Sequence, residues 1–464
     1  MQDPIPQRLT LETAVEAAIK FDPWLLGNRH QQDSIESLSV AAGTMVDPKV
    51  SLGIVNIASD SFDFNQEAMT QFKVSVSQMF PRGDSLSMKK QRLGFLAEQY
   101  PYLRENRKGI VSVLVSQLWL DAFNTQQSIL LIEKNRSLFE QLADVAQASY
   151  ASTIGKTRQQ DIVRAQLELT RLDDRLTVLK QKKEIYLEKL SEWINNNLLI
   201  NSSFRNEDPN SWLIRIFQME LNRELPKIKM LLPELYLSRM AMTQQKVFEN
   251  LAAHPSLLAV EKKIQASESS ISIAKQNYKP EWGINAGYGY RADDVSSLNS
   301  TAHNRSDLFS IGISFDLPLF TSNRQDMQLN SAVSKTEAIK TEKTLLARKM
   351  IANFESYRAQ LLRLKERQNL YQNQLLPQMH DQAEASLTAY TNDDGDFAEV
   401  IRSRIAELNA RIDYIGIDVE KQKTILQLNY IFMKSADQIV IQDTQLVSDV
   451  ENRSNKKFGL GELK

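Results

Sequence analysis

The chain has 464 residues, 42% of them hydrophobic and 24% charged, and its 56 Lys and Arg almost balance its 57 Asp and Glu. A formal net charge of -1 excludes a broadly basic surface, so nucleic-acid binding by counterion release is not expected. The absence of cysteine excludes disulfides, thiolate zinc sites and cysteine nucleophiles. No apolar run approaches the ~20 residues of a membrane-spanning helix, which excludes a helical membrane protein.

Two halves of the chain carry the same markers in the same order. Pro23 and Pro255 each follow a short helical segment, and a further proline comes 25 residues after each, at Pro48 and Pro280 (48−23 and 280−255). Such an internal repeat predicts one structural unit used twice. We therefore expect a first repeat over residues 1–232, a second over 233–440 and a polar C-terminal tail over 441–464.

Within each repeat the hydrophobic pattern changes in a fixed order, from helical to alternating and back to helical. Only 15 Gly and 13 Pro punctuate the chain, so the helical stretches can be long. In the first repeat we predict a helical segment at about 9–43, strands at about 49–57 and 71–79, a helical hairpin at about 83–195 and a connecting segment at 195–232. The second repeat should have a helical segment at about 233–278, strands at about 281–290 and 308–317, and a helical hairpin at about 321–430.

The alternating segments place apolar and aromatic side chains on one face and small or polar ones on the other. Their length of 9–10 residues suits a tilted membrane strand with lipid outside and water inside. Soluble sheets show the same alternation, and the alternation taken by itself favours a soluble sheet. On the membrane interpretation, the predicted lipid-facing residues are Phe72, Val74, Val76, Trp282, Ile284, Phe309, Ile311, Ile313 and Phe315.

The predicted hairpins carry heptad-like seams, from Ile162 to Trp193 and from Ile401 to Leu426, which predict coiled-coil packing. The stretch before the first turn could form a helix of ~100 Å, in which Pro101 predicts a kink or a break. Two helices cannot bury such seams alone, and four strands cannot close a barrel in a membrane. We therefore expect neighbouring hairpins, from other copies of the chain, and hence an oligomer.

Several segments together resemble the TolC-like outer-membrane efflux factors. They are LTLETAVEAAIKFDP at the start, SVSQMFPRG and SFDLPLF where strand passes into helix, and the tips ASYASTIGKTRQQDIVRAQLEL and EASLTAYTNDDGDFAEVIRSRIAEL. The resemblance extends from about Leu9 to Ile431. The first half is similar to the branch that serves heavy-metal cation pumps of the resistance-nodulation-division type.

The resemblance implies a mainly α protein with a membrane β-barrel. It implies a homotrimer in the outer membrane of a Gram-negative bacterium, extending into the periplasm, with a signal peptide already removed. Three chains would give 3 × 4 = 12 strands in one β-barrel and 12 helices in a periplasmic α-barrel. The implied function is a passive exit duct that contacts outer-membrane lipids, a periplasmic adaptor protein and an inner-membrane pump, with residues 195–232 and the tail in an equatorial belt.

The hairpin turns are the predicted functional sites. On the resemblance, the tips that dock the adaptor are Thr153, Ile154, Gly155, Lys156, Gly395 and Asp396. Charged residues nearby are candidates for a gate at the periplasmic aperture, closed by acid–base links between adjacent hairpins: Asp161, Asp393, Asp394, Asp396, Glu399, Arg158 and Arg404. The alternatives are a solvated glycine turn and ordinary exposed ion pairs along the helices.

The sequence supports an enzyme or a soluble scaffold less well than an exit duct. No nucleophile elbow, P-loop or dinucleotide fingerprint is present, so we expect neither an enzyme nor a cofactor. His30, His254, His303 and His380 lack ligand spacing, which argues against a resident metal. A soluble coiled-coil scaffold would explain the seams but not the strand faces. Drug efflux and type I secretion remain alternatives to metal-cation export.

Overall fold

The computed structural model describes residues 8–151, 159–194, 220–233, 244–293, 305–392 and 395–440. The chain divides into two compact units, and each takes segments from both halves of the sequence. One, the helical unit, comprises Met1–Leu26, Leu103–Leu257 and Leu346–Lys464; the other, the sheet unit, comprises Gly27–Tyr102 and Leu258–Leu345. The division of the chain into two repeats remains a prediction.

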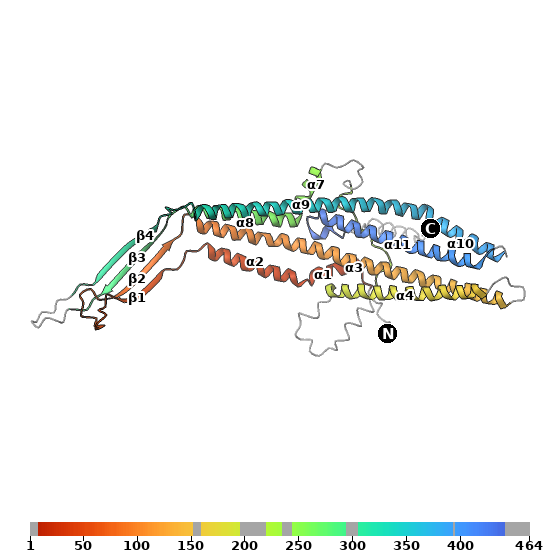
Figure 1. Cartoon of the computed structure of the whole chain (residues 1–464), viewed down its shortest axis with the longest axis horizontal. Helices are drawn as coiled ribbons and strands as arrows, with labels where there is room; N and C mark the ends of the chain where they lie inside the picture. Colours follow the sequence, from red (N-terminus) through yellow and green to blue (C-terminus); the bar gives the residue numbers. More distant parts are fainter. Residues whose placement is uncertain are drawn as a thin grey trace, which may run out of the picture. The chain divides into compact units, whose positions relative to one another are not determined.

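The sheet unit contains four antiparallel strands in the order β1-β2-β3-β4 (Figure 1). They are β1 (Lys49–Val55), β2 (Gln71–Phe80), β3 (Glu281–Tyr290) and β4 (Leu308–Asp316). The predicted strands are therefore confirmed to within two residues. The central pair joins the two halves of the chain, since β2 pairs with β3 from Phe72↔Tyr290 to Phe80↔Trp282.

Side-chain bonds to backbone fix the points where strands pass into helices. Arg82 follows β2 and donates to the carbonyl oxygens of Asn277 and Lys279, at 3.1 and 3.3 Å. Its guanidinium also forms an ion pair with Asp316 at the end of β4. Because one arginine satisfies carbonyls of one connection and a carboxylate of the other, both halves of the chain share one strand-to-helix junction.

The helices follow the predicted order, and several begin where a side chain caps them. They are α1 (Leu11–Lys20), α2 (Pro23–Ala42), α3 (Ser85–Ala151), α4 (Gln159–Ile194), α7 (Gln244–Leu251), α8 (Pro255–Gln276), α9 (Gln325–Leu370), α10 (Leu376–Thr391) and α11 (Phe397–Phe432). The predicted segment 9–43 is two helices, because Asp22 accepts from the backbone N–H of Trp24 and Pro23 begins the second helix. Within the described ranges, no helix is long and apolar enough to cross a membrane.

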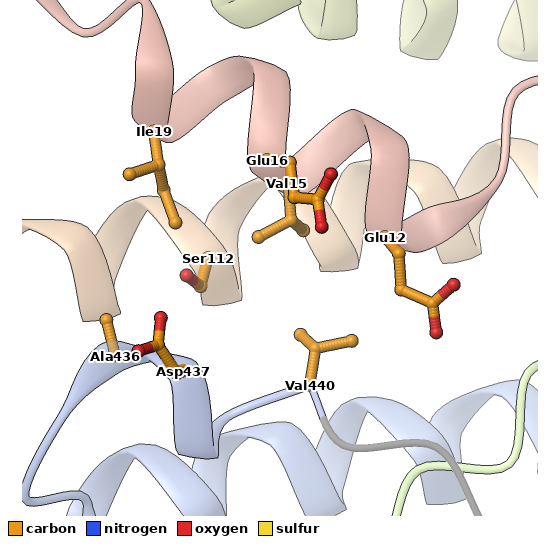
Figure 2. Close-up of a pocket in the computed structure, with 8 residues that line it drawn as sticks. All are labelled: Glu12, Val15, Glu16, Ile19, Ser112, Ala436, Asp437 and Val440. Atoms are coloured by element: carbon orange, nitrogen blue, oxygen red, sulfur yellow. The ribbon is translucent and has the colours of Figure 1, made fainter. Parts of the chain in front are cut away.

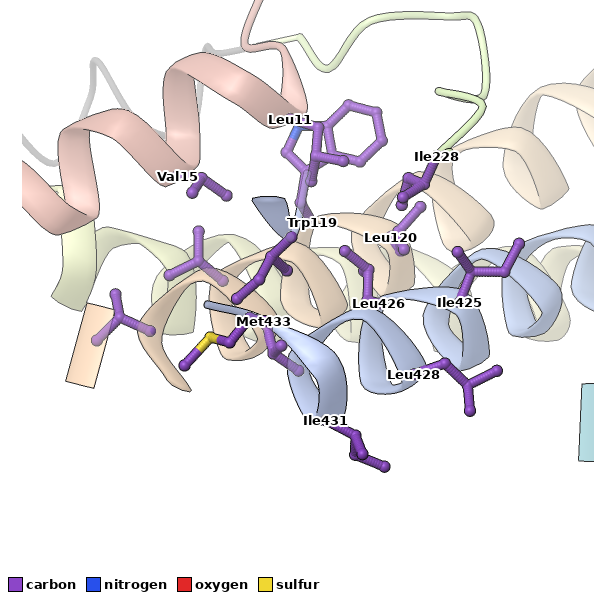
Figure 3. Packing of buried hydrophobic residues seen from close by; sticks show 14 of the residues in the cluster. Leu11, Val15, Trp119, Leu120, Ile228, Ile425, Leu426, Leu428, Ile431 and Met433 are labelled. Atoms are coloured by element: carbon purple, nitrogen blue, oxygen red, sulfur yellow. The ribbon is translucent and has the colours of Figure 1, made fainter. Parts of the chain in front are cut away.

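Trp119 of α3 lies at the centre of the helical unit's main core. It is fully buried, stacks on Phe123 with 5.5 Å between ring centroids, and donates its indole N–H to the Leu9 carbonyl at 3.1 Å. Figure 3 shows side chains of α1, α3 and α11 converging around it. A single chain therefore builds a closed apolar core here.

A second core lies nearer the hairpin turns and joins the two hairpins of the same chain. Its buried members come from three helices and are Ile129, Ile132, Phe139, Leu142, Ala165, Leu172, Leu176, Phe397, Val400, Ile401 and Leu408. Seam residues of α4 and α11 therefore lie in one core, and their packing as a coiled coil remains a prediction. The neighbouring hairpin that covers this part of the first seam belongs to the same chain, which corrects the expectation that other copies supply it.

Polar residues within the α11 seam hold the segment at 220–233. Gln422, 7% exposed, accepts from the backbone N–H of Ile228 at 3.0 Å. Asn429, fully buried, accepts from Leu231 N–H and donates to the Lys229 carbonyl. Buried amides persist in an apolar seam because they satisfy backbone groups that would otherwise lose water without a partner. Residues 195–219 and 441–464, also assigned to the belt or tail, lie outside the described residues.

The interruption of the long helices is not at the position that proline suggested. Of the predicted kink or break at Pro101, the break is wrong, because α3 continues through this residue; the kink stays a prediction. In the second hairpin a π-helical turn, Tyr371–Leu375, separates α9 from α10. The Leu376 N–H bonds to the Tyr371 carbonyl five residues earlier, and Pro377 follows without an N–H of its own. A π turn is a known way for a helix to pass such a residue.

Candidate functional site: an apolar sheet face and two hairpin ends

The strand register places every predicted lipid-facing residue on one face of the sheet. Leu52 pairs with Val74, Val74 with Tyr288, and Tyr288 with Phe309 across all four strands. The set Phe72, Val74, Val76, Trp282, Ile284, Phe309, Ile311, Ile313 and Phe315 therefore shares a face, here called the apolar sheet face. That these residues share a face is confirmed; that the face meets lipid remains a prediction.

This face is strongly exposed in the single chain. Ile311 and Phe309 are 72% and 73% exposed, and Leu52 in β1 is 67% exposed. Most residues of the opposite face are small or polar, with exceptions such as Met79 and Val55, and Gly287 there lies between Ser75 and Ser310. Large contiguous apolar surfaces on a chain mark contact with a membrane or another protein.

Aromatic residues gather at both ends of the apolar sheet face. At the junction end, Phe80 stacks on Trp282 at 4.3 Å between ring centroids, and Trp282 pairs with Phe315. At the other end, Phe72 pairs with Tyr290 and Tyr288 with Phe309. Aliphatic residues fill the space between. Several of these residues are among the predicted lipid-facing set, but the two bands become visible only once the register aligns the first and last positions of each strand.

Of the tip residues predicted to dock an adaptor, the structure describes Gly395 and Asp396. Thr153, Ile154, Gly155, Lys156, Arg158, Asp393 and Asp394 lie outside the described residues. A Cβ on Gly395 would come within 2.6 Å of the Tyr390 backbone nitrogen and 2.8 Å of the Ala389 carbonyl carbon. Since those atoms are backbone, bulk at Gly395 would distort the turn itself. Substitution of this glycine would therefore not test docking alone.

The acidic gate candidates differ in environment. Asp396 is exposed and caps α11, accepting from Ala398 N–H at 3.2 Å. Glu399 pairs with Arg402, one turn along the same helix. Asp161 is only 5% exposed within the chain. The first two therefore have ordinary roles at the beginning of a helix, where carboxylates are favourable, and their place at an aperture remains a prediction.

Arg404, a predicted gate cation, forms ion pairs within the second hairpin. Its guanidinium contacts Glu384 of α10 at 2.7 Å and Glu407 of α11 at 3.1 Å. Glu407, whose side chain is 6% exposed, also accepts from His380 at 2.9 Å and from Arg411 at 2.5 Å. The expected links between adjacent hairpins thus correspond, for Arg404, to a link between α10 and α11 of one hairpin.

Charge balance explains why this buried carboxylate is ionised. Burial raises the pKa of Glu407, but hydrogen bonds from His380 and Arg404 outweigh burial and bring the pKa below its usual value. Burial lowers the pKa of Arg404, yet its hydrogen bonds to Glu384 and Glu407 raise the pKa overall. Glu407 is not among the predicted gate residues, and its spacing of three residues to Arg404 and four to Arg411 is shared by many exposed helix pairs.

A small acidic cavity of about 180 Å³ lies in the helical unit (Figure 2). The cavity is lined by Glu12 and Glu16 of α1, by Asp437 of the 3₁₀ turn Ala436–Gln438 that follows α11, and by apolar side chains. Ser112, also in the lining, donates to the Lys108 carbonyl. In the ranges that the structure describes, no three acidic, His or Cys side chains converge as metal ligands would, so this cavity is not assigned a metal.

His254 is a structural histidine rather than a ligand. Its Nδ1 accepts from Ser256 N–H at 3.1 Å, so Nε2 carries the proton and donates to the Tyr430 carbonyl at 3.0 Å. Burial lowers the pKa of His254 to about 4, only partly opposed by the Tyr430 bond. The ring is therefore neutral in the folded protein at neutral pH.

Comparison with known proteins gives the fold and a partial family match. Residues 248–428 match the family model described as outer membrane efflux protein. Curated proteins give no match to the sequence. The fold is similar to that of the Campylobacter jejuni CmeC outer membrane channel, at 12% identity and a TM-score of 0.68, over 96% of this chain and 89% of that one.

Two further solved structures agree. The outer-membrane channel OprN gives a TM-score of 0.70 at 13% identity, over 92% of this chain and 90% of that chain. VceC, an outer membrane protein of Vibrio cholerae, gives 0.67 at 13% identity over 91% and 95%. At these identities the likeness establishes the fold, that of TolC-like outer-membrane channels, as the resemblance in the sequence implied.

Proposed function

We propose that this chain is the outer-membrane exit duct of a tripartite efflux system in a Gram-negative bacterium. The observation that carries the proposal is the apolar sheet face, 72% exposed at Ile311 and bounded at both ends by aromatic pairs. Transmembrane barrels have such an apolar band between two aromatic girdles. The efflux-protein match over residues 248–428 and the channel-like fold support the same conclusion.

The working form is a homotrimer. The described sheet ends at β1 and β4, which pair with no further strand of the described chain. A membrane does not tolerate open sheet edges, so β4 of one copy would pair with β1 of the next. Three copies close 3 × 4 = 12 strands, and their hairpins form the α-barrel below, with the coiled-coil seams at its helix contacts.

The duct itself performs no covalent chemistry and works with two partners. An inner-membrane pump supplies the energy, and a periplasmic adaptor binds the hairpin turns around Gly155 and Gly395. Because Gly395 is needed by its own turn, a docking test is better made at the exposed Asn392, which ends α10. Asn392→Arg should abolish efflux while leaving a folded trimer, and normal efflux by this variant would argue against docking at the second turn.

Metal cations are the proposed cargo, on the strength of the resemblance of the first half to the metal-pump branch. Carboxylates near the turns would raise the local cation concentration at a threefold ring. Cells lacking the gene should lose resistance to a heavy-metal salt more than to organic drugs. The opposite ranking would favour drug efflux, and retention of a secreted protein would favour type I secretion.

The central test is membrane insertion and conduction. We expect the protein in the outer-membrane fraction, released only by detergent, and channel activity of the purified trimer in planar lipid bilayers. A protein recovered from the soluble fraction without detergent, and silent in bilayers, would refute the duct and favour the coiled-coil scaffold.

A further inference from the structure

A cavity of about 390 Å³ lies between α3, α8 and α9 of the sheet unit, and its lining combines polar side chains with the apolar Ile273, Ala274 and Ala332. It is much larger than the ~30 Å³ that one water occupies. Its walls are one face each of two helices: Ser267, Ser270 and Asn277 recur at helical spacing along α8 and just past its end, and Gln328, Ser331 and Lys335 along α9. Arg92 of α3 completes the lining.

The two cations of this cavity lack the partners that nearby cations have. Among the described residues, neither Arg92 nor Lys335 forms an ion pair, and the Nε–H of Arg92 is buried without an acceptor. No carboxylate lines the cavity. Several other lysines on α8 and α9 form ion pairs, Lys262 with Glu98, Lys263 with Glu342 and Lys340 with Glu268. Lys275 of α8, like Lys335, forms none among the described residues.

One hydroxyl group in the lining can add a hydrogen-bond donor to this positive charge. The Ser270 hydroxyl donates to the Ala266 carbonyl at 3.3 Å, and Ser267 donates to Thr336 at 2.8 Å, because the Thr336 hydroxyl itself donates to the Ala332 carbonyl. Ser331 is exposed at the cavity wall and has its proton available. A guanidinium, an ammonium and a rotatable hydroxyl form a donor set that binds phosphate oxygens, with the guanidinium offering two parallel N–H groups.

The cavity begins near the junction end of the sheet, where one of the two aromatic bands lies. Asn277 is four residues before Glu281, the first residue of β3, and Trp282 with Phe80 forms the band at this end. From Asn277 to Ser267 the wall extends ~15 Å along α8, at 1.5 Å per residue. Aromatic bands mark the interface between hydrocarbon and headgroups, so the Asn277 end of the cavity would lie on the headgroup side of the band. Lys335 lies at the other end, beside the Thr336 that bonds Ser267.

We propose that this cavity binds the phosphate group of a phospholipid headgroup, with Arg92 and Lys335 as its charged ligands. The phosphate chemistry rests on the cavity itself, whereas the lipid as its source rests on the proposed membrane function. Binding would give the Arg92 Nε–H an acceptor and anchor the strand-to-helix junction to the inner surface of the membrane.

The test uses the full-length protein in an uncharged detergent and three probes. They are short-chain phosphatidylglycerol, inorganic phosphate and short-chain diacylglycerol, with binding followed by titration calorimetry. We expect the phospholipid to bind and diacylglycerol not to bind. Removing one charge-assisted contact, in Arg92→Gln or Lys335→Gln, should weaken binding by roughly tenfold to a hundredfold.

Matched variants separate the site from general surface charge. Lys89→Gln and Lys349→Gln remove one exposed cation each from the same two helices, outside the cavity, and should bind as the wild type does. Ser331→Asp places a carboxylate in the wall and should abolish binding, whereas Ser334→Asp, three residues away, should not. If Arg92→Gln misfolds, Arg92→Lys takes its place in the test. Arg92→Lys keeps the positive charge and should retain part of the affinity.

Each outcome decides a defined part of the proposal. Equal loss in cavity and control variants, or equal binding of diacylglycerol, would overturn the phosphate site. Binding of inorganic phosphate with the same dependence on Arg92 and Lys335, but no binding of phosphatidylglycerol, would overturn the lipid source. Because titration is done in detergent, a protein that fails to conduct in planar bilayers would refute the duct without affecting this result.

Discussion

The apolar sheet face and the core around Trp119 use similar side chains but treat them in opposite ways. Trp119 and Leu120 are fully buried within one chain, whereas Phe309 and Ile311 are 73% and 72% exposed. The helical unit therefore meets its own requirement for burial. The sheet does not, and its apolar face needs a solvent other than water or a surface of another molecule. The difference locates the membrane proposal in the sheet and the intrinsic stability in the helices.

The largest expected effect is a loss of stability when a side chain of the buried core is truncated. Trp119→Ala removes a buried indole and its hydrogen bond to the Leu9 carbonyl, and should lower the free energy of unfolding by about 3–5 kcal/mol. Denaturant titration of the detergent-solubilised protein measures it. Phe320, 89% exposed, is the control: Phe320→Ala should change the same quantity by about 0.5 kcal/mol or less. Equal losses would show that the two environments do not differ as described.

The next effect tests the open side. Ile311→Arg places a charge on the apolar sheet face and should cost about 2–4 kcal/mol near the middle of a bilayer. Ser310→Arg, one residue away on the opposite face, should leave assembly intact and reduce conductance. Gly312 is a poorer control, because a Cβ there would lie 2.6 Å from the Asn285 amide oxygen. Trimer yield in outer-membrane fractions decides; equal yields would refute the assignment of faces.

A third effect, of similar or smaller size, separates the units by pH. The pKa of His254 is about 4 in the folded protein and 6.5 as the ordinary value, so the unfolded chain binds the proton first as pH falls. The stability contribution of neutral His254 is complete above pH 6.5 and is lost progressively down to about pH 4, by on the order of 3 kcal/mol. His254→Gln should flatten this part of the profile of the helical unit.

The face on which each strand residue lies was predictable from sequence, because period-two alternation fixes which residues of a strand point the same way. Val74, Trp282 and Ile311 were therefore assigned correctly to one side. The order in which strands and hairpins join was not, since the β2–β3 pairing and the packing of Leu172 against the second hairpin depend on contacts between distant segments.

The polar sites were predicted least well. Glu407 and Arg92 carry no local motif, and their roles follow from the side chains that tertiary structure brings around them. Pro101 shows the opposite failure, because a local rule for proline predicts a kink or a break, and α3 continues through this residue without a break. Local rules decide element type here, whereas the partners of charged groups are decided by packing.

The smallest expected change in stability is at the beginning of α11, where removing a negative charge could change ion conduction without changing the free energy of unfolding. Glu399 and Arg402 form an exposed pair of the kind that contributes only a few tenths of a kcal/mol. Asp396→Asn keeps a side chain that caps helices well, so Asp396→Asn with Glu399→Gln should leave folding unchanged. If these carboxylates line the aperture, threefold repetition makes their loss visible as weaker cation selectivity and higher single-channel conductance.

Glu366→Gln, which breaks a comparable exposed pair with Arg363 on α9, should change neither quantity. Asp161 is buried, so Asp161→Asn made alone tests whether its charge acts from inside the hairpin. Unchanged selectivity and conductance in all of these variants would leave the acidic residues as helix caps and surface pairs, and would exclude an acidic gate at these positions.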